Sequence, residues 1–278
     1  MQAGISQPNG SASRPRVSSH GVIIVNADDW GRDTLTTDRT RECVRQGTVS
    51  SVSAMVWMAD SERSAAIAQQ EAIDAGLHLN LTSSFTAADV PVGVREHQEK
   101  VGRYLRSSRF ASAIYHPGLR QSFEYVIAAQ IEQYESLYGA RPFRIDGHHH
   151  MHLSANVLMG NLLPEGTVVR RSFSFRPGEK SVANRAFRRL VNSILARRHR
   201  LTDLFFSLPP IEAARLQAIL RLGASSVVEL ECHPVNSDEY AFLTSGGISR
   251  CSDAVELSSF ARHFSSMSPC MPDRVLTN

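Results

Sequence analysis

Short apolar runs alternate along this sequence with longer segments whose apolar residues recur at helical spacing. The short runs predict buried strands, and the longer segments predict helices that pack against them. Regular alternation of the two is typical of a parallel sheet assembled from βα units. The strands are expected at residues 22–25, 49–57, 76–82, 143–150, 166–175, 203–208 and 225–234. The helices are expected at residues 37–46, 60–76, 123–139, 156–163, 184–200, 211–223 and 253–264.

Two segments depart from this alternation. Residues 1–20 are rich in Ser, Gly and Pro and lack the apolar stretch of a signal peptide, so we expect a disordered tail. The segment from Phe85 to Pro117 mixes Pro, Gly and charged residues. We expect it to be a long loop region of the kind that often carries function. With no internal repeat and no linker in the sequence, residues 21–278 are expected to form a single α/β domain.

Composition narrows the class of protein. The 278 residues are 42% apolar, which is enough for a sizeable core. Their formal net charge of +3 is too small for a strong polyanion binder, so no nucleic-acid partner is expected. The four cysteines have no CxxC spacing, which argues against a disulfide framework and fits a reducing cytoplasm. No apolar run approaches the roughly 20 residues of a membrane span.

Polar side chains gather at the carboxyl ends of four predicted strands. They are Asp28, Asp29, His78, Asn80, Asp146, His148 and His233. In a barrel of parallel strands these ends share one face, where active sites lie. Simpler roles are open to each residue alone: Asp28 could cap the next helix, Asp29 could hydrogen-bond its loop, and His78 could be a satisfied core histidine.

Four histidines lie within five residues just after Asp146. On an extended chain His148, His150 and His152 share one face and His149 takes the other, so His149 is the member best suited to a purely structural role. One Asp carboxylate with two neutral imidazoles suits Zn, Fe, Co or Mn, and suits Mg less well. The cluster is therefore a candidate metal site.

Two further residues would complete the chemistry. Asp146 could orient a ligand histidine from behind, and His233, held extended by Pro234, could donate a proton at neutral pH. A metal ion, a carboxylate base and a histidine acid together describe metal-assisted hydrolysis. The sequence has no GxSxG, GxGxxG, HExxH or Walker pattern that would favour another mechanism.

Four segments resemble, in order and spacing, the motifs of the YdjC-like carbohydrate deacetylases, which include chitooligosaccharide deacetylases. These segments are IVNADDWG, GLHLNLT, RIDGHHHMH and ECHP, and the resemblance extends from Val22 to about His263. It implies a distorted (β/α) barrel of the glycoside hydrolase/deacetylase type. It also implies removal of an acetyl group from an N-acetylated sugar.

The resemblance also implies roles for individual residues. Asp29, His78 and His148 match the metal ligands, Asp28 matches the catalytic base, and His233 is the candidate general acid. Contacts with substrate are expected from Trp30, Asn80, Asp146, His150 and His152. The sequence departs from the family pattern in three places, which bear on the sugar that fits: Trp30 replaces the usual Phe, Gly147 a frequent Ser, and Val235 the glycine that commonly follows His-Pro.

The leading hypothesis is a hydrolase with one divalent metal ion, zinc being preferred over Mg, Co, Mn or Fe. It would remove the acetyl group of an N-acetylated amino sugar or its conjugate, with water activated by Asp28. The alternatives are hydrolysis of an O-acetyl ester or a phosphoester at the same site, or a non-catalytic carbohydrate-binding module. A cytoplasmic location and a homodimer are compatible with the sequence.

The predicted helix at 184–200 is strongly basic. Its arginines are Arg185, Arg188, Arg189, Arg197, Arg198 and Arg200. A solvated helical face is the simpler interpretation. The alternative is attraction of an anionic part of the substrate, such as a nucleotide or lipid diphosphate. A membrane-surface role is less favoured, because the apolar residues of this helix fit a core-facing stripe.

Overall fold

A computed structural model describes residues 21–175, 179–251 and 257–265 of the chain. The expected tail at 1–20 and part of the expected helix at 253–264 lie outside the described residues. Seven parallel strands form a sheet in the order β5-β4-β3-β2-β1-β7-β6. The strands are β1 (Val22–Trp30), β2 (Ser51–Ala54), β3 (Ala75–Leu79), β4 (Arg144–Gly147), β5 (Val168–Val169), β6 (Leu204–Ser207) and β7 (Val227–Cys232).

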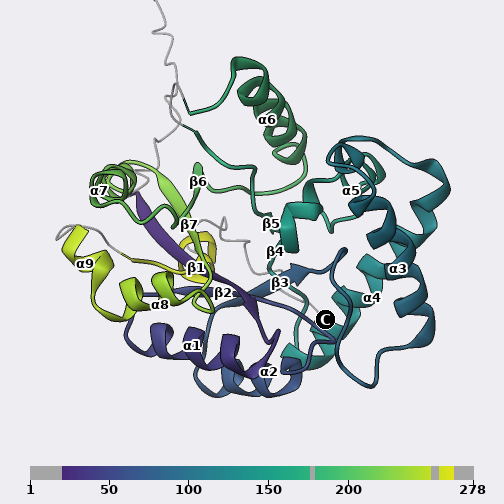
Figure 1. The fold of residues 1–278 in the computed structure, drawn as a ribbon, viewed down its shortest axis with the longest axis horizontal. Helices are drawn as coiled ribbons and strands as arrows, with labels where there is room; N and C mark the ends of the chain where they lie inside the picture. Colours follow the sequence, from purple (N-terminus) through teal and green to yellow (C-terminus); the bar gives the residue numbers. More distant parts are fainter. Residues whose placement is uncertain (1–20, 176–178, 252–256, 266–278) are drawn as a thin grey trace, which may run out of the picture.

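The sheet has the strand order of a barrel that is open between β5 and β6. Isolated hydrogen bonds cross this opening in place of a ladder: the Val169 amide donates to the Arg200 carbonyl at 2.9 Å, and the Ser174 amide donates to the Phe205 carbonyl at 2.8 Å. Helices surround the strands (Figure 1). The fold is therefore a distorted (β/α) barrel, as the sequence predicts.

The helices are α1 (Thr34–Arg45), α2 (Ser61–Gln70), α3 (Val92–Arg106), α4 (Arg120–Tyr138), α5 (Ala155–Gly160), α6 (Val182–Leu195), α7 (Ala213–Leu222), α8 (Ser237–Thr244), α9 (Gly247–Cys251) and α10 (Phe260–Ser265). They connect successive strands, with two between β3 and β4, and α8, α9 and α10 follow β7. The carboxylate of Asp33 caps α1 by accepting from the Thr36 amide at 2.8 Å, so Asp28 does not serve as its cap. Among the described residues, no helix has both the length and the apolar content of a membrane span.

The prediction of a long loop region between Phe85 and Pro117 is wrong. The central 15 residues of this region form α3, whose buried residues Val94, Gln98, Val101 and Leu105 recur at helical spacing and pack toward α4. Charged residues and two glycines stand between these positions and hide the pattern. The expected strand at 166–175 is likewise shortened to two residues, and Leu257, expected in a helix, pairs with Ile23 as an isolated bridge.

Strand residues alternate between two buried faces of different character. One face joins the helices in the main apolar core, with Val25, Val52, Leu77, Ile145 and Leu230 among its members. The other face is enclosed by the curled sheet. At the start of the strands it is an apolar cluster of Val22, Ile24, Val168 and Val227 under Phe260 and Phe264. Further along, the same face becomes polar, although it stays buried: Asn26, Asp28, Ser53, His78, Arg144, Asp146, Glu229 and Glu231.

The enclosed face leaves no room beside Gly76 on β3. A Cβ at this position would lie 2.7 Å from the guanidinium carbon of Arg144, whose own hydrogen bonds hold it in place. We expect Gly76→Ala to lower the free energy of unfolding by about 3 kcal/mol, measured by urea unfolding. Gly139→Ala is the control, because Gly139 has open space but a φ of 76°. It should cost only about 1 kcal/mol, and equal losses in the two variants would contradict crowding at Arg144.

Candidate active site

The end of β1 brings two adjacent carboxylates to one point. Side chains normally alternate along a strand, but Asp29 has a φ of 65°, and the pairing of β1 with β2 is irregular between Ala27 and Trp30. As a result, Asp29 Oδ1 lies 3.4 Å and Asp28 Oδ2 lies 3.9 Å from the same atom, Nε2 of His78. A left-handed residue of this kind is strained, and such strain is typical of functional sites.

Three donor atoms converge beside this turn. Asp29 Oδ1 lies 3.4 Å from His78 Nε2 and 2.9 Å from His148 Nδ1, and the three side chains offer atoms that all lie within 4.8 Å of one another. Asp29 Oδ1 is buried and accepts no hydrogen bond, whereas Oδ2 accepts from Arg32 Nη1 at 2.8 Å. One carboxylate oxygen and two imidazole nitrogens facing a common space are suited to hold a divalent metal ion.

Asp146 fixes the orientation of His78. Its Oδ1 lies 2.6 Å from Nδ1 of His78, which turns Nε2 toward the two aspartates. Its Oδ2 accepts from Ser53 at 2.6 Å and from Arg144 at 2.5 Å. Burial opposes the charged form of His78, but Asp28 and Asp146 prevail and raise its pKa to about 10. Asp146 is fully buried, so it is placed to orient a histidine and presents no surface to a ligand.

Arg170, which follows β5, joins most of the remaining carboxylates. Its two terminal nitrogens donate to the two oxygens of Asp28, each at 2.7 Å. It also donates to Glu229 at 2.6 Å and to Glu231 at 3.1 Å, and it lies 3.2 Å from Asp146. Burial alone would raise the pKa of Asp28, but the Arg170 charge outweighs it and lowers that pKa. Asp28 is therefore an ionised carboxylate held in a fixed orientation.

Four charged residues of this site were not predicted from the sequence: Arg144, Arg170, Glu229 and Glu231. The alternation in VVELEC, with an acid at every second position, was a signal for a polar enclosed face, but the segment reads equally well as an ordinary strand. Burial, reinforced by the charge of Asp28, raises the pKa of Glu231 well above its ordinary value. Side-chain atoms of Asp28, Glu231 and His233 all lie within 4.8 Å of one another.

The histidine cluster is a tight turn. Residues His148–Leu153 form a 3₁₀ segment in which His149 and His150 have φ values of 55° and 57°. The expectation that alternate histidines share a face is therefore wrong. The chain turns at His149 and His150, so the histidine side chains point in different directions. His148 meets Asp29, and His149 lies 3.0 Å from the Thr82 hydroxyl.

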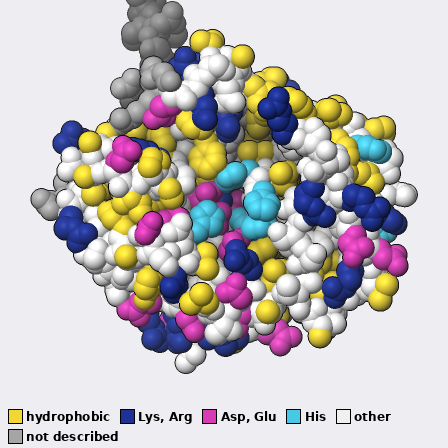
Figure 2. Space-filling model, viewed as in Figure 1, with side chains coloured by type: hydrophobic (Ala, Val, Ile, Leu, Met, Phe, Trp, Pro, Cys, Tyr) yellow, Lys and Arg dark blue, Asp and Glu magenta, His cyan; other side chains and the backbone are white. Residues whose placement is uncertain are grey.

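The other two histidines of the turn differ in exposure. His150 is partly exposed, and its Nε2 lies 3.7 Å from Glu231. His152 is fully buried and donates from Nε2 to the Arg170 carbonyl at 3.0 Å. Figure 2 shows histidine side chains gathered in a central hollow with acidic side chains behind them. His150 is thus placed to meet a ligand, whereas His152 supports the arginine below.

Two more residues expected to touch substrate are buried in the wall of the site. The Trp30 ring lies in the main core, and its Nε1 donates to the Ser64 carbonyl at 3.2 Å. Asn80 closes its own turn: its Oδ1 accepts from the Ser83 amide at 2.9 Å, and its Nδ2 donates to the Ser83 carbonyl at 2.8 Å. With His152, these residues shape the site from behind and present no surface to a ligand.

Comparison with known proteins agrees with this architecture. Residues 22–259 match the sequence profile of the family described as YdjC-like protein. A carbohydrate deacetylase of Geobacillus stearothermophilus is 30% identical over 244 residues, covering 84% of this chain and 86% of that protein. A chitooligosaccharide deacetylase of Serratia marcescens is 30% identical over 137 residues, covering 49% of this chain and 52% of that protein.

A solved structure shares the fold. It is a protein of Enterococcus faecalis provisionally named for cellobiose-phosphate cleavage, and it superposes with a TM-score of 0.62 at 19% identity. The superposition covers 89% of this chain and 99% of the Enterococcus chain. At this identity the likeness concerns the fold alone.

The buried charges give a test of stability. Arg170→Met should lower the free energy of unfolding at pH 7 by about 3–5 kcal/mol, because several carboxylates lose their buried counter-charge. Glu231→Gln should change it by less than about 0.5 kcal/mol, because burial and the charge of Asp28 raise the pKa of this carboxyl and so disfavour its charge, and Gln has nearly the same shape. Urea unfolding of both variants measures the difference, and a large loss in Glu231→Gln would show that Glu231 is ionised.

Proposed function

The chain belongs to the YdjC-like family, and we propose that it is a hydrolase that removes the acetyl group of an N-acetylated amino sugar or its conjugate, using one divalent metal ion. The observation that carries this proposal is the convergence of Asp29, His78 and His148 next to a separate, ionised carboxylate, Asp28. A site that only bound sugar would not need Asp28 held there by Arg170. The names of the curated relatives support an acetylated sugar as substrate.

The donor set fits a metal ion. Asp29 Oδ1, a buried oxygen without a hydrogen bond, and the two imidazole nitrogens have the composition that zinc accepts readily, with Co, Mn, Fe or Mg as alternatives. When bound, such an ion would polarise the acetyl carbonyl and make water more acidic. Arg32, on the other oxygen of Asp29, keeps that carboxylate turned so that Oδ1 faces the histidines.

Asp28 is the proposed general base. Arg170 keeps its pKa low, so the carboxylate is ionised at neutral pH and can take a proton from the water that attacks the acetamide carbon. Because the same guanidinium disfavours the protonated form, Asp28 holds that proton only weakly and can pass it on. The bidentate contact at 2.7 Å also fixes which way the carboxylate points.

His233 is the proposed general acid. Its ring is half-buried beside Asp28 and Glu231, and its backbone amide donates to Glu239 at 2.8 Å, which ties the strand end to α8. In the proposed reaction the oxygen of water joins the acyl carbon and the C–N bond breaks. His233 gives a proton to the nitrogen that leaves as a free amine. The products are acetate and an amino sugar in equal amounts.

Two matched substitutions separate the proposed roles of the aspartates. Asp28→Asn should keep the metal and lower acetate release from N-acetylglucosamine oligomers by about 10³-fold, because the base is lost. Asp29→Asn should lose the metal, and Asn tolerates the left-handed backbone that this position needs. Metal content and acetate release are measured together, with Asp38→Asn on α1 as the control. Full turnover in Asp28→Asn would remove it as the base.

The raised pKa of His78 makes metal binding depend on pH. Without a metal, His78 carries a proton on both nitrogens below a pH of about 10, and Nε2 must lose its proton to become a ligand. Metal affinity should therefore rise about tenfold per pH unit between pH 6 and 8. Calorimetry in buffers of different ionisation enthalpy should count about one proton released per metal ion at pH 7 from His78. Asp146→Asn should release fewer protons, and release unchanged in that variant would contradict this account.

A further inference from the structure

Four arginines surround one cavity beside the active site. This cavity, named here the arginine pocket, lies between α6 and the segment that follows β5 and measures about 250 Å³. Its charged lining consists of Arg171, Arg185, Arg188 and Arg189, and the other lining residues are Phe173, Ser174, Phe175, Asn192 and Leu204. Among the described residues that line it there is no carboxylate.

These guanidinium groups are poorly neutralised by the protein. Among the described residues, none of the ion pairs involves Arg171, Arg185, Arg188 or Arg189. Nε of Arg185 and Nε of Arg171 are buried without a hydrogen-bond partner. Arg188 is half-buried, and its Nε donates to the neutral amide oxygen of Asn184 at 2.8 Å. Charged groups in such surroundings would gain from an anion that brings its own negative charge.

Of the four arginines that line the pocket, Arg171 has the most hydrogen bonds and a carboxylate nearby. Its Nη1 donates to the carbonyls of Thr202 and Asp203, and the Asp203 carboxylate attracts it. That carboxylate already accepts from the Val227 amide at 2.8 Å. The binding capacity of the pocket therefore rests mainly on the arginines of α6.

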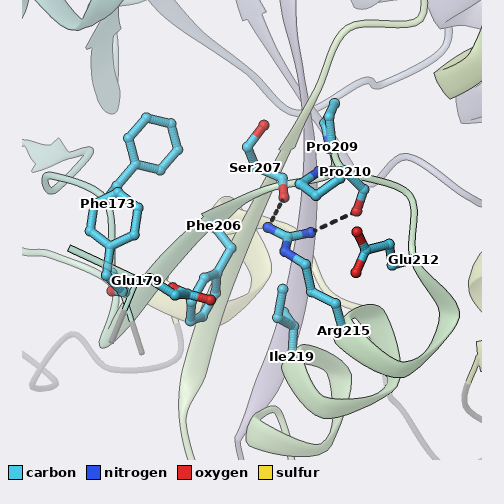
Figure 3. Close-up of a pocket in the computed structure, with 11 residues that line it drawn as sticks. Phe173, Glu179, Phe206, Ser207, Pro209, Pro210, Glu212, Arg215 and Ile219 are labelled. Carbon is cyan, nitrogen blue, oxygen red and sulfur yellow. Dashed lines mark hydrogen bonds between the residues drawn. The ribbon is translucent and has the colours of Figure 1, made fainter. Parts of the chain in front are cut away.

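A neighbouring cavity contains an arginine whose guanidinium donates hydrogen bonds and has carboxylates nearby. It measures about 400 Å³, shares Phe173 with the arginine pocket and is lined by Glu179, Glu212 and Arg215 (Figure 3). There Arg215 donates to the carbonyls of Ser207 and Pro210, and carboxylates lie in the same lining. Within the described part of the chain, the lack of acidic lining residues therefore distinguishes the arginine pocket from the cavity next to it.

The arginine pocket is connected to the histidines of the active site. The ring of Phe173, which lines the pocket, meets the His150 ring edge-on at 4.7 Å between centroids. A third cavity, of about 210 Å³, has both Arg188 and the pair His149 and His150 in its lining. Figure 2 shows basic side chains over α6, directly above the histidine hollow. A ligand at the arginines can thus be joined to a sugar at the histidines.

The structure divides the basic helix into two parts. Arg198 pairs with Glu165 at 3.3 Å, Arg197 is exposed, and Arg200 lies over the rings of Phe143 and Phe264, all away from the pocket. Arg185 and Arg188 are half-buried and line it. These two residues are therefore less exposed than a fully solvated helical face implies. Planar guanidinium groups match the oxygens of phosphate in pairs, and they bind it better than a single point charge does.

We propose that the arginine pocket binds a phosphate or diphosphate group of the substrate, so that the sugar is deacetylated as an anionic conjugate. This inference rests on the proposed function and names its substrate class. A sugar 1-phosphate, a nucleotide-linked sugar and a polyprenyl-diphosphate-linked sugar all carry this group, and they differ in what lies beyond it.

Acetate release from matched substrates tests the proposal. The panel is N-acetylglucosamine, its 1-phosphate, its UDP conjugate and its polyprenyl diphosphate in detergent, each with the metal-loaded enzyme. At least one phosphate-bearing member should exceed the neutral sugar in kcat/KM, and the best of them identifies the carrier. Equal kcat/KM for neutral and phosphate-bearing sugars would overturn the anion site and leave the deacetylase function standing.

A double substitution locates the effect. Arg185→Gln with Arg188→Gln should lower kcat/KM for the best phosphate-bearing substrate about 100-fold, mostly through KM, because two charge-assisted hydrogen bonds are lost. Neutral N-acetylglucosamine should be processed as before. Arg197→Gln with Arg198→Gln removes the same charge outside the pocket and should change neither. An equal loss on neutral and anionic sugars would show a structural role and overturn the proposal.

A binding measurement keeps the two proposals separable if no substrate releases acetate. Phenyl phosphate is titrated calorimetrically into the metal-loaded protein and into both double variants. Binding that is lost in the Arg185/Arg188 variant and kept in the Arg197/Arg198 variant would support the pocket even though the deacetylase function had failed. Absent binding, or binding that is equal in all three proteins, would overturn it.

Discussion

The guanidinium of Arg170 is the charge on which the enclosed face of the sheet depends. It is fully buried and lies within hydrogen-bond or ion-pair distance of Asp28, Asp146, Glu229 and Glu231, which come from three different strands. Carboxylates brought this close would repel one another and resist burial without it. The same contact that lets the curled sheet close around polar residues also sets the ionisation and direction of Asp28. Fold stability and site chemistry therefore rest on one group.

Much of the fold followed from the sequence because strand and helix periods are distinct and because parallel strands place their carboxyl ends together. That rule predicts that Asp28, Asp29, His78 and His148 lie together, and the structure places them together. It could not foresee the left-handed Asp29 or the turn at His149 and His150, because these depend on local register and steric strain rather than on periodicity. Nor could it separate Glu229 from an outward-facing strand residue, since direction is decided by which face the sheet encloses.

The layering of the enclosed face explains how the donors are kept in position. Val22, Ile24 and their apolar neighbours fill the start of the barrel, and the polar residues stand on top of that layer. Arg144 lies over the ring of Phe260 and reaches Asp146, which in turn holds His78. A chain of contacts thus runs from an apolar base to the donor atoms, and each step restricts the next.

The gap between β5 and β6, called here the seam, should make backbone amides exchange with solvent at different rates in different parts of the sheet. β1 is hydrogen-bonded to a neighbouring strand on each side. β5 has two residues, and in the described part of the chain isolated hydrogen bonds alone join it to the β6 side. Opening at this seam breaks few hydrogen bonds and leaves the rest of the sheet intact. Amide protons of Val169 and Ser174 should therefore exchange with solvent through small local fluctuations, and those in the middle of β1 only when the whole domain unfolds. The seam borders the arginine pocket, so the least protected line of the barrel runs along the wall where a bulky ligand would need room.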